Sequence, residues 1–182
     1  GRDCAIRLLW PVGLIYFALP PWGLLDRPLQ WLTVQIVNQA VGIAGIPAFV
    51  QDNFFQLPSG TFEIALGCSG LNYLITALSL FSYYGLMYLG TWKKRFQLLS
   101  VAVAVAIVSN WIRVFALIVV GYATDMRHYL IQVEHHYFGW VLFALLMWPV
   151  LRLARALEDP ESDAVLPAAA IPTVSAAVLP AA

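Results

Sequence analysis

The chain has 182 residues, of which 61% are hydrophobic and 11% are charged, and its formal net charge is zero. Soluble domains contain about 25% charged residues, so this composition argues against a soluble enzyme, a disordered chain and a disulfide-rich secreted scaffold. The balanced charge offers no basic surface for nucleic acid. A multi-pass membrane protein is therefore predicted.

The first half of the chain holds two apolar runs and a strand-like segment. Residues 8–25 form an apolar run broken by prolines, and residues 29–46 form a second run that contains Gln and Asn. The second run predicts either an interfacial helix or a weak span. Residues 47–67 alternate aromatic and polar side chains, which predicts a β-hairpin with a turn at Ser59-Gly60. Because a hairpin does not sit in lipid, we expect it at the membrane interface or outside the membrane.

The second half predicts further spans, at residues 71–89, 98–122 and 137–151. A short basic loop at 91–97 separates the first two, and a polar loop at 123–136 precedes the last. The predicted fold class is therefore an all-α multi-pass membrane protein with about four or five transmembrane or interfacial helices. A small extracytoplasmic β-hairpin is predicted before the helix that bears Cys68.

Domain organisation follows from the same composition. Residues 1–157 are predicted to form one membrane-embedded domain, and the start at Gly1 suggests an N-terminal truncation. Residues 158–182 are rich in Ala and Pro and predict a linker or disordered tail.

Basic residues set the predicted orientation. With the N-terminus and the basic loop inside and the hairpin outside, Arg27 and Arg127 lie outside. The inner segments carry the larger set: Arg2, Arg7, Lys93, Lys94, Arg95, Arg152 and Arg155. This distribution satisfies the positive-inside rule. It places Cys68, Arg113 and residues 128–136 toward the outer face.

Arg113 is the unusual residue of the strongest span. It lies roughly 13 Å below the outer end of that helix, where a charge costs roughly 2.5–3.5 kcal/mol on insertion scales. We therefore expect a partner or a wet cavity. A purely structural pairing with Glu63 or Glu134 is one interpretation, and a functional role is the other. Asn110, on the same helix face, is expected to support the guanidinium.

Cys68 lies between Gly67 and Gly70 at the start of a predicted helix. The helix dipole and a nearby arginine would favour the thiolate nucleophile there, whereas a small buried hydrophobe is the alternative. The outer-loop histidines also leave two possibilities open, a general base beside Cys68 or a metal site. The residues available for that metal are His128, Glu134, His135 and His136. The tryptophans Trp22, Trp31 and Trp140 suit an aromatic belt.

Three motifs occur in order: Cys68-Ser69-Gly70-Leu71, Asn110-Trp111-Ile112-Arg113-Val114 and His135-His136-Tyr137-Phe138-Gly139-Trp140. Together they resemble the exosortase/archaeosortase family of membrane cysteine transpeptidases. The resemblance covers about residues 47–151 and includes Leu57-Pro58-Ser59-Gly60. The family pattern Cys-Ser-Gly, Asn-x-x-Arg and His-x-x-x-Gly falls on Cys68, Arg113 and His135. Leu66 and Asn72 depart from residues common in the family.

The resemblance implies a protease/transpeptidase of the bacterial inner membrane. Its substrates would be exported proteins with a C-terminal transmembrane sorting tail of the PEP-CTERM type, cleaved at the periplasmic face. The implied catalytic residues are Cys68, which forms a thioester, His135 as general acid/base, and Arg113 as oxyanion stabiliser. The implied supporting residues are Ser69, Gly70, Asn110 and Glu134.

The resemblance implies no cofactor and no metal, an acceptor amine of unknown identity, and membrane lipid as the surroundings. The substrate helix would dock laterally, with Ala77 and Gly85 making room. Two alternatives belong to other classes. One is a membrane metalloprotein that uses the His128, His135, His136 and Glu134 set, and the other is a non-catalytic membrane assembly subunit.

Overall fold

The structure is a computed structural model that describes residues 20–125 and 135–158. Most of the predicted 8–25 run and of the 158–182 tail therefore lies outside the described residues. The described helices, in chain order, are η2 (Pro20–Leu25), α2 (Asp26–Ile43), η3 (Leu66–Cys68), α3 (Leu71–Tyr88), α4 (Trp92–Ala123) and α6 (His135–Ala156). Three short strands lie between α2 and η3.

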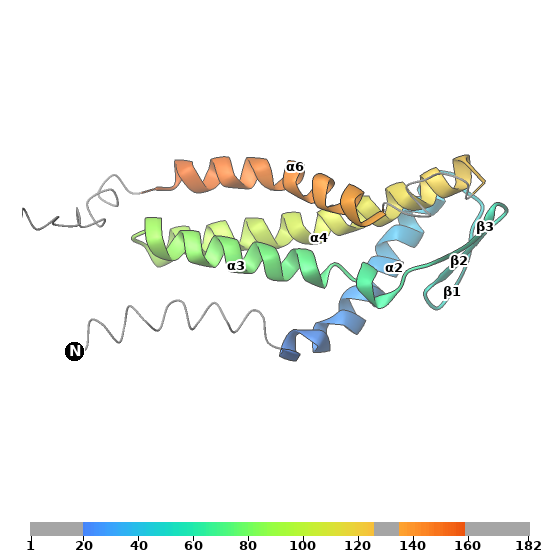
Figure 1. Cartoon of the computed structure of the whole chain (residues 1–182), viewed down its shortest axis with the longest axis horizontal. Coiled ribbons are helices and arrows are strands. Elements are labelled where there is room, and N and C mark those ends of the chain that lie inside the picture. The colour runs from blue at the N-terminus through green and yellow to red at the C-terminus, as the bar shows by residue number, and fades with distance from the viewer. Residues whose placement is uncertain (1–19, 126–134, 159–182) are drawn as a thin grey trace, which may run out of the picture.

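The helices α3, α4 and α6 lie side by side as a bundle (Figure 1). Small buried side chains alternate with large ones in its core, as in Ala77, Ala102 and Ala106 beside Phe81 and Leu98. Small residues let helix backbones approach closely. Ala77 is consequently buried inside the bundle, and a Cβ on Gly85 would lie 3.5 Å from the Arg95 side chain. The prediction that these two positions admit a substrate helix is wrong.

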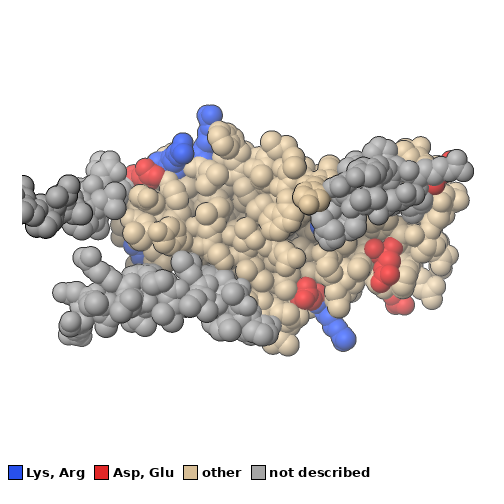
Figure 2. Space-filling model, viewed as in Figure 1, with Lys and Arg blue, Asp and Glu red and all other residues tan. Residues whose placement is uncertain are grey.

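Two described helices are long and apolar enough to cross a membrane, α4 and residues Tyr137–Ala156 of α6. The predicted spans at 98–122 and 137–151 lie within them, whereas neither α3 nor α2 meets the same test. On the face shown in Figure 2, charged side chains lie toward the two ends of the molecule with an uncharged stretch between them. That distribution is typical of a protein whose middle lies in lipid.

The basic residues at one end of the bundle belong to a helix rather than to the predicted 91–97 loop. Because α4 begins at Trp92, Lys93 and Lys94 lie in its first turn. Arg95 Nε donates to the Leu89 carbonyl at 2.8 Å, and the Arg95 guanidinium carbon lies 5.0 Å from the centre of the Trp92 ring. These contacts tighten the turn that joins α3 to α4.

A three-stranded antiparallel sheet lies at the other end (Figure 1), made of β1 (Phe49–Gln51), β2 (Phe54–Leu57) and β3 (Gly60–Glu63) in that order. The predicted hairpin corresponds to β2 and β3, but its turn is Pro58-Ser59, because Leu57 pairs with Gly60. Proline suits the first central position of such a turn. The additional strand β1 turns back at Asp52, whose φ of 54° is one that aspartate tolerates.

The sheet and α2 pack together on the last turns of α4. Their shared core is apolar and consists of Val34, Val37, Val41, Phe55, Leu57, Ile64, Val114 and Ile118. α4 has 32 residues, which is about 48 Å at 1.5 Å per residue and exceeds a hydrocarbon thickness of about 30 Å. Since open sheet edges do not face lipid, the sheet packed on these turns requires surroundings other than lipid hydrocarbon.

Candidate active site

Cys68 lies in a tight turn between the sheet and α3. It ends η3, and its backbone N–H donates to the Ala65 carbonyl at 2.8 Å. The turn continues to Gly70, the residue that precedes α3, so Cys68 lies before the helix rather than in its first turn. Gly70 has φ +92°, and a Cβ there would lie 2.8 Å from Asn110 Cγ. Glycine is required at this position by both its backbone conformation and its contact with α4.

A hydrogen bond from α4 holds the Cys68 backbone. Asn110 Nδ2 donates to the Cys68 carbonyl at 2.9 Å and to Thr33 Oγ1 of α2 at 3.3 Å. Asn110 is 1% exposed, so these bonds form away from bulk water. The sequence predicts that Asn110 supports Arg113. In the structure the Asn110 amide donates instead to the Cys68 turn, which is a stretch of irregular backbone.

Helix α2 holds the next residue of the turn. Ser69 Oγ donates to Asp26 Oδ1 at 2.7 Å and accepts from the Leu71 N–H at 3.3 Å. Thr33 Oγ1 donates to the Ser69 carbonyl in a longer bond of 3.4 Å. The turn is therefore bonded to α2, α4 and the start of α3 at once, which restricts its backbone.

Arg113 lies one turn further along α4, buried against α3. It is 5% exposed, and its guanidinium carbon lies 5.2 Å from the centre of the Tyr73 ring. Glu63 is not its partner, because that carboxylate accepts from Asn53 Nδ2 at 3.3 Å within the sheet. Glu134 lies outside the described residues. Among residues 20–125 and 135–158, Arg113 Nε is buried without a hydrogen-bond partner.

A small cavity of about 100 Å³ separates Arg113 from the Cys68 turn. It is lined by Gly67, Gly70, Asn72, Tyr73, Asn110, Arg113 and Trp140. Cys68 is half-buried, packs against the apolar core under the sheet, and is not itself among the lining residues. Tyr73 packs against Arg113 and interacts electrostatically with Cys68, so it lies near both groups that the motifs single out.

Helix α6 packs at Gly139 against two of the cavity-lining residues, Arg113 and Tyr73. A Cβ at this position would lie 2.7 Å from Arg113 Cδ and would also collide with the Tyr73 hydroxyl. Trp140 packs edge-on against Tyr73, with 5.5 Å between ring centres. Trp140 therefore forms part of the cavity wall, a position that its assignment to an aromatic belt missed.

The sequence also missed Asp26, Thr33 and Tyr73. Thr33 lies in the 29–46 run, which is predicted only as an interfacial helix or a weak span, and Asp26 lies just before that run. Their bonds to the Cys68 turn depend on how α2 packs across α4. One sequence signal for the role of α2 was available, the helical spacing of Thr33, Val34, Val37 and Val41, which the structure buries. This spacing marks the helix face that packs into the protein, and Thr33 places a hydroxyl group on that face.

Of the predicted histidines, the structure describes only the backbone of His135 and His136. His135 begins α6, one helical turn before Gly139. The side chains of His135 and His136, and the whole of His128 and Glu134, lie outside the described residues. Within the described part of the chain no cluster of His, Cys, Asp or Glu is arranged to hold a metal. The outer-loop metal site stays a prediction.

A protein-family model described as transmembrane exosortase matches residues 1–152 of the chain. The match includes the Cys68 turn, the residues that hold it and every residue that lines the cavity. No curated protein and no solved structure matches the chain.

Proposed function

The chain belongs to the transmembrane exosortase family, and from that premise we propose that Cys68, Arg113 and His135 carry out its reaction. Membership implies a membrane transpeptidase or protease that acts on exported proteins with sorting tails. One observation carries the assignment of residues: the Cys68 turn, Arg113 of α4 and Trp140 of α6 border one small cavity, and Gly139 packs against Arg113 beside it. Irregular backbone and a buried cation are both costly, and here they lie together.

Cys68 supplies the nucleophile in this proposal. Its thiolate attacks the carbonyl carbon of the scissile peptide bond, so that a C–S bond forms and, after collapse of the tetrahedral intermediate, the C–N bond breaks. His135 accepts the thiol proton and returns it to the leaving amine. Its position supports this role, because residues four apart on a helix share a face and Gly139 lies against the cavity.

Arg113 stabilises the oxyanion of the tetrahedral intermediate. Its Nε is buried and has no partner among the described residues, and a donor left in that state costs roughly 1–3 kcal/mol or more. A substrate oxygen would satisfy it. One such donor in a low-dielectric site is worth about 2.7–4 kcal/mol of transition-state stabilisation.

The supporting residues keep the nucleophile in place. Asn110 and Ser69 hold the Cys68 backbone through the bonds described above, and Gly70 allows α4 to approach it. Glu134 precedes His135 and is proposed to orient the imidazole. The thioester is then resolved by an acceptor amine or by water, with no cofactor or metal in the reaction.

We place the cavity at the extracytoplasmic face of a bacterial inner membrane. The sheet lies at the cavity end of the bundle and needs an aqueous phase. The basic first turn of α4 lies at the opposite end, where the positive-inside rule places the cytoplasm. In this arrangement residues 1–157 act as the membrane-embedded domain and residues 158–182 as a tail.

A covalent adduct tests the proposal. The protein is expressed in membranes together with a tagged exported protein that carries a sorting tail. We expect a hydroxylamine-sensitive adduct between enzyme and substrate that disappears in Cys68→Ala and persists in Cys4→Ala. Processing that continues in Cys68→Ala would contradict the proposal and favour an assembly role.

The two adjacent histidines give a second test. His135→Ala is expected to abolish processing, while His136→Ala is expected to retain most of it, because only His135 stands four residues before Gly139, as the family pattern His-x-x-x-Gly requires. Equal losses in both variants, at equal protein levels, would contradict the assignment of His135.

A further inference from the structure

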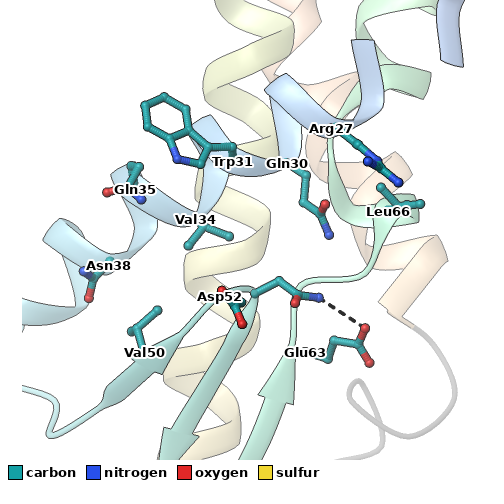
Figure 3. A pocket seen from close by; sticks show the side chains of 11 residues that line it. Arg27, Gln30, Trp31, Val34, Gln35, Asn38, Val50, Asp52, Glu63 and Leu66 are labelled. Carbon is teal, nitrogen blue, oxygen red and sulfur yellow. Dashed lines mark hydrogen bonds between the residues drawn. The ribbon is translucent and has the colours of Figure 1, made fainter. Parts of the chain in front are cut away.

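A second, larger hollow lies beside the Cys68 turn. This groove of about 720 Å³ runs between α2 and the sheet (Figure 3). One wall is a single face of α2, made of Arg27, Gln30, Trp31, Val34, Gln35 and Asn38. The other wall comes from Val50, the β1–β2 turn at Asp52 and Asn53, and the end of β3 with Leu66. The mechanism proposed above uses none of these residues.

One end of the groove reaches the Cys68 turn. Figure 3 shows Arg27 and Leu66 together at that end and Asn38 and Val50 at the other. Leu66 begins η3, which ends at Cys68. Arg27 follows Asp26, whose carboxylate holds Ser69. A molecule lying in the groove would therefore end next to the nucleophile.

The lining chemistry suits a peptide backbone. Gln35 and Asn38 are exposed and make no side-chain hydrogen bond within the part of the chain that the structure describes. Each amide offers both donors and an acceptor, as a peptide group requires. Apolar surface lies beside them on the Arg27 side, from buried Val34 and from Trp31, which is 63% exposed.

The charges of the groove are mixed. Asp52 and Glu63 lie on the sheet wall and Arg27 on the α2 wall, which suits neither a polyanion nor an acyl chain. The dimensions suit a short extended segment. The face of α2 from Arg27 to Asn38 is roughly 16 Å long at 1.5 Å per residue, which matches about five residues at about 3.3 Å each.

We propose that this groove binds an extended segment of the polypeptide substrate, about five residues long, and directs the adjoining peptide bond to the Cys68 turn. The proposal deepens the proposed function and rests on it, since it takes Cys68 as the attacking group. The amides of α2 bond the substrate backbone, and Trp31 and Val34 contact its side chains. Recognition and bond cleavage then occupy neighbouring hollows on the two sides of the Cys68 turn.

Blocking the groove tests the proposal with a matched control on the same helix. Asn38→Trp fills the groove, whereas Gln39→Trp adds the same side chain at an exposed neighbour that does not line it. Processing of the tagged substrate and alkylation of Cys68 by N-ethylmaleimide are both measured in membranes. We expect Asn38→Trp to lower processing about tenfold or more while alkylation changes less than about twofold. Wild-type processing in Asn38→Trp, or an equal loss in Gln39→Trp, would overturn the proposal.

Photocrosslinking separates this proposal from the assignment of Cys68. A photoreactive amino acid replaces Asn38 or Gln39 in a Cys68→Ala chain, in which uncleaved substrate accumulates. We expect the tagged substrate to crosslink from position 38 and not from position 39. No crosslink from 38 would overturn the groove, even if Cys68 is catalytic. A crosslink from 38 together with continued processing in Cys68→Ala would support the groove and overturn the proposed function.

Discussion

The helix bundle and the sheet end of this molecule are held together in different ways. In the bundle, serine hydroxyl groups bond within their own helix, as Ser79 does to the Ile75 carbonyl and Ser109 to the Val105 carbonyl. At the sheet end, side chains bond across elements, as Gln30 does to the Ile64 carbonyl and Asn110 to that of Cys68. The change occurs between adjacent residues of α4, Ser109 and Asn110.

The difference follows from what each region must satisfy. Helices satisfy their own backbone hydrogen bonds, so they pack by shape alone and tolerate a lipid surrounding. The Cys68 turn is irregular backbone, and its carbonyls need partners from other elements when they are buried. A buried irregular turn of this kind can therefore form only where side chains of another helix reach it. The cavity lies at this boundary, and the predictions below test how far the two regions depend on each other.

We expect the largest effect at Gly139, where α6 of the bundle packs against Arg113 and Tyr73 beside the cavity. In Gly139→Ala the new methyl group would collide with Arg113 and Tyr73, so α6 must move away from the cavity. We expect processing to fall by about 100-fold or more, since displacements of about 1 Å at a reacting centre have effects of that size. The measurement is the rate of substrate processing in membranes. Gly42→Ala, where the methyl group meets nothing within 4 Å, is the control and should process normally.

Asn110 and Ser109 provide a comparison within one helix turn. Asn110→Asp keeps the shape but removes the Nδ2 donor, leaving the Cys68 carbonyl without that bond. An unsatisfied buried group costs about 1–3 kcal/mol, so we expect processing to fall by roughly 10- to 100-fold. Ser109→Ala removes only a bond within α4 and should change processing less than about twofold. Equal effects of the two changes, at equal protein levels, would contradict the comparison.

Thr33 tests whether α2 belongs to the site. Thr33→Val removes the hydroxyl that bonds Ser69 and Asn110, and we expect a loss of about tenfold in processing rate with similar substrate affinity. Thr33→Ser should restore most of the activity. Thr76→Val removes a hydroxyl that bonds only within α3 and is expected to behave as wild type. A loss seen only in protein level, with normal processing per molecule, would make Thr33 a packing residue.

Overpacking the bundle should affect stability rather than chemistry. Ala102 is fully buried between helices, so Ala102→Leu should lower the free energy of unfolding by about 1–3 kcal/mol. Thermal unfolding in detergent measures this change, and processing per folded molecule should stay within about twofold. Val108→Leu, at a position that is 42% exposed, should leave the melting temperature unchanged. A large loss of processing without a loss of stability would show that the bundle core acts on the site directly.

Much of the secondary structure could be predicted from residues that are neighbours in the sequence. Long apolar runs predicted α4 and most of α6, because helix formation and membrane insertion depend on composition over about 20 neighbouring residues. The Pro58-Ser59-Gly60 stretch located the β2–β3 turn to within one residue, since turn conformations are set by proline and glycine. The order of the three motifs predicted the family, which the family model matching residues 1–152 confirmed.

The folded structure was needed to show which of these residues contact one another. The strand β1 has three residues, too few for alternation to reveal it. Asn110 and Thr33 are 77 positions apart, and Ser69 is 43 positions from Asp26. Nothing in either stretch specifies such a contact. It arises because the sheet and α2 bury their apolar faces on the end of α4, and that packing brings the polar side chains to the Cys68 turn.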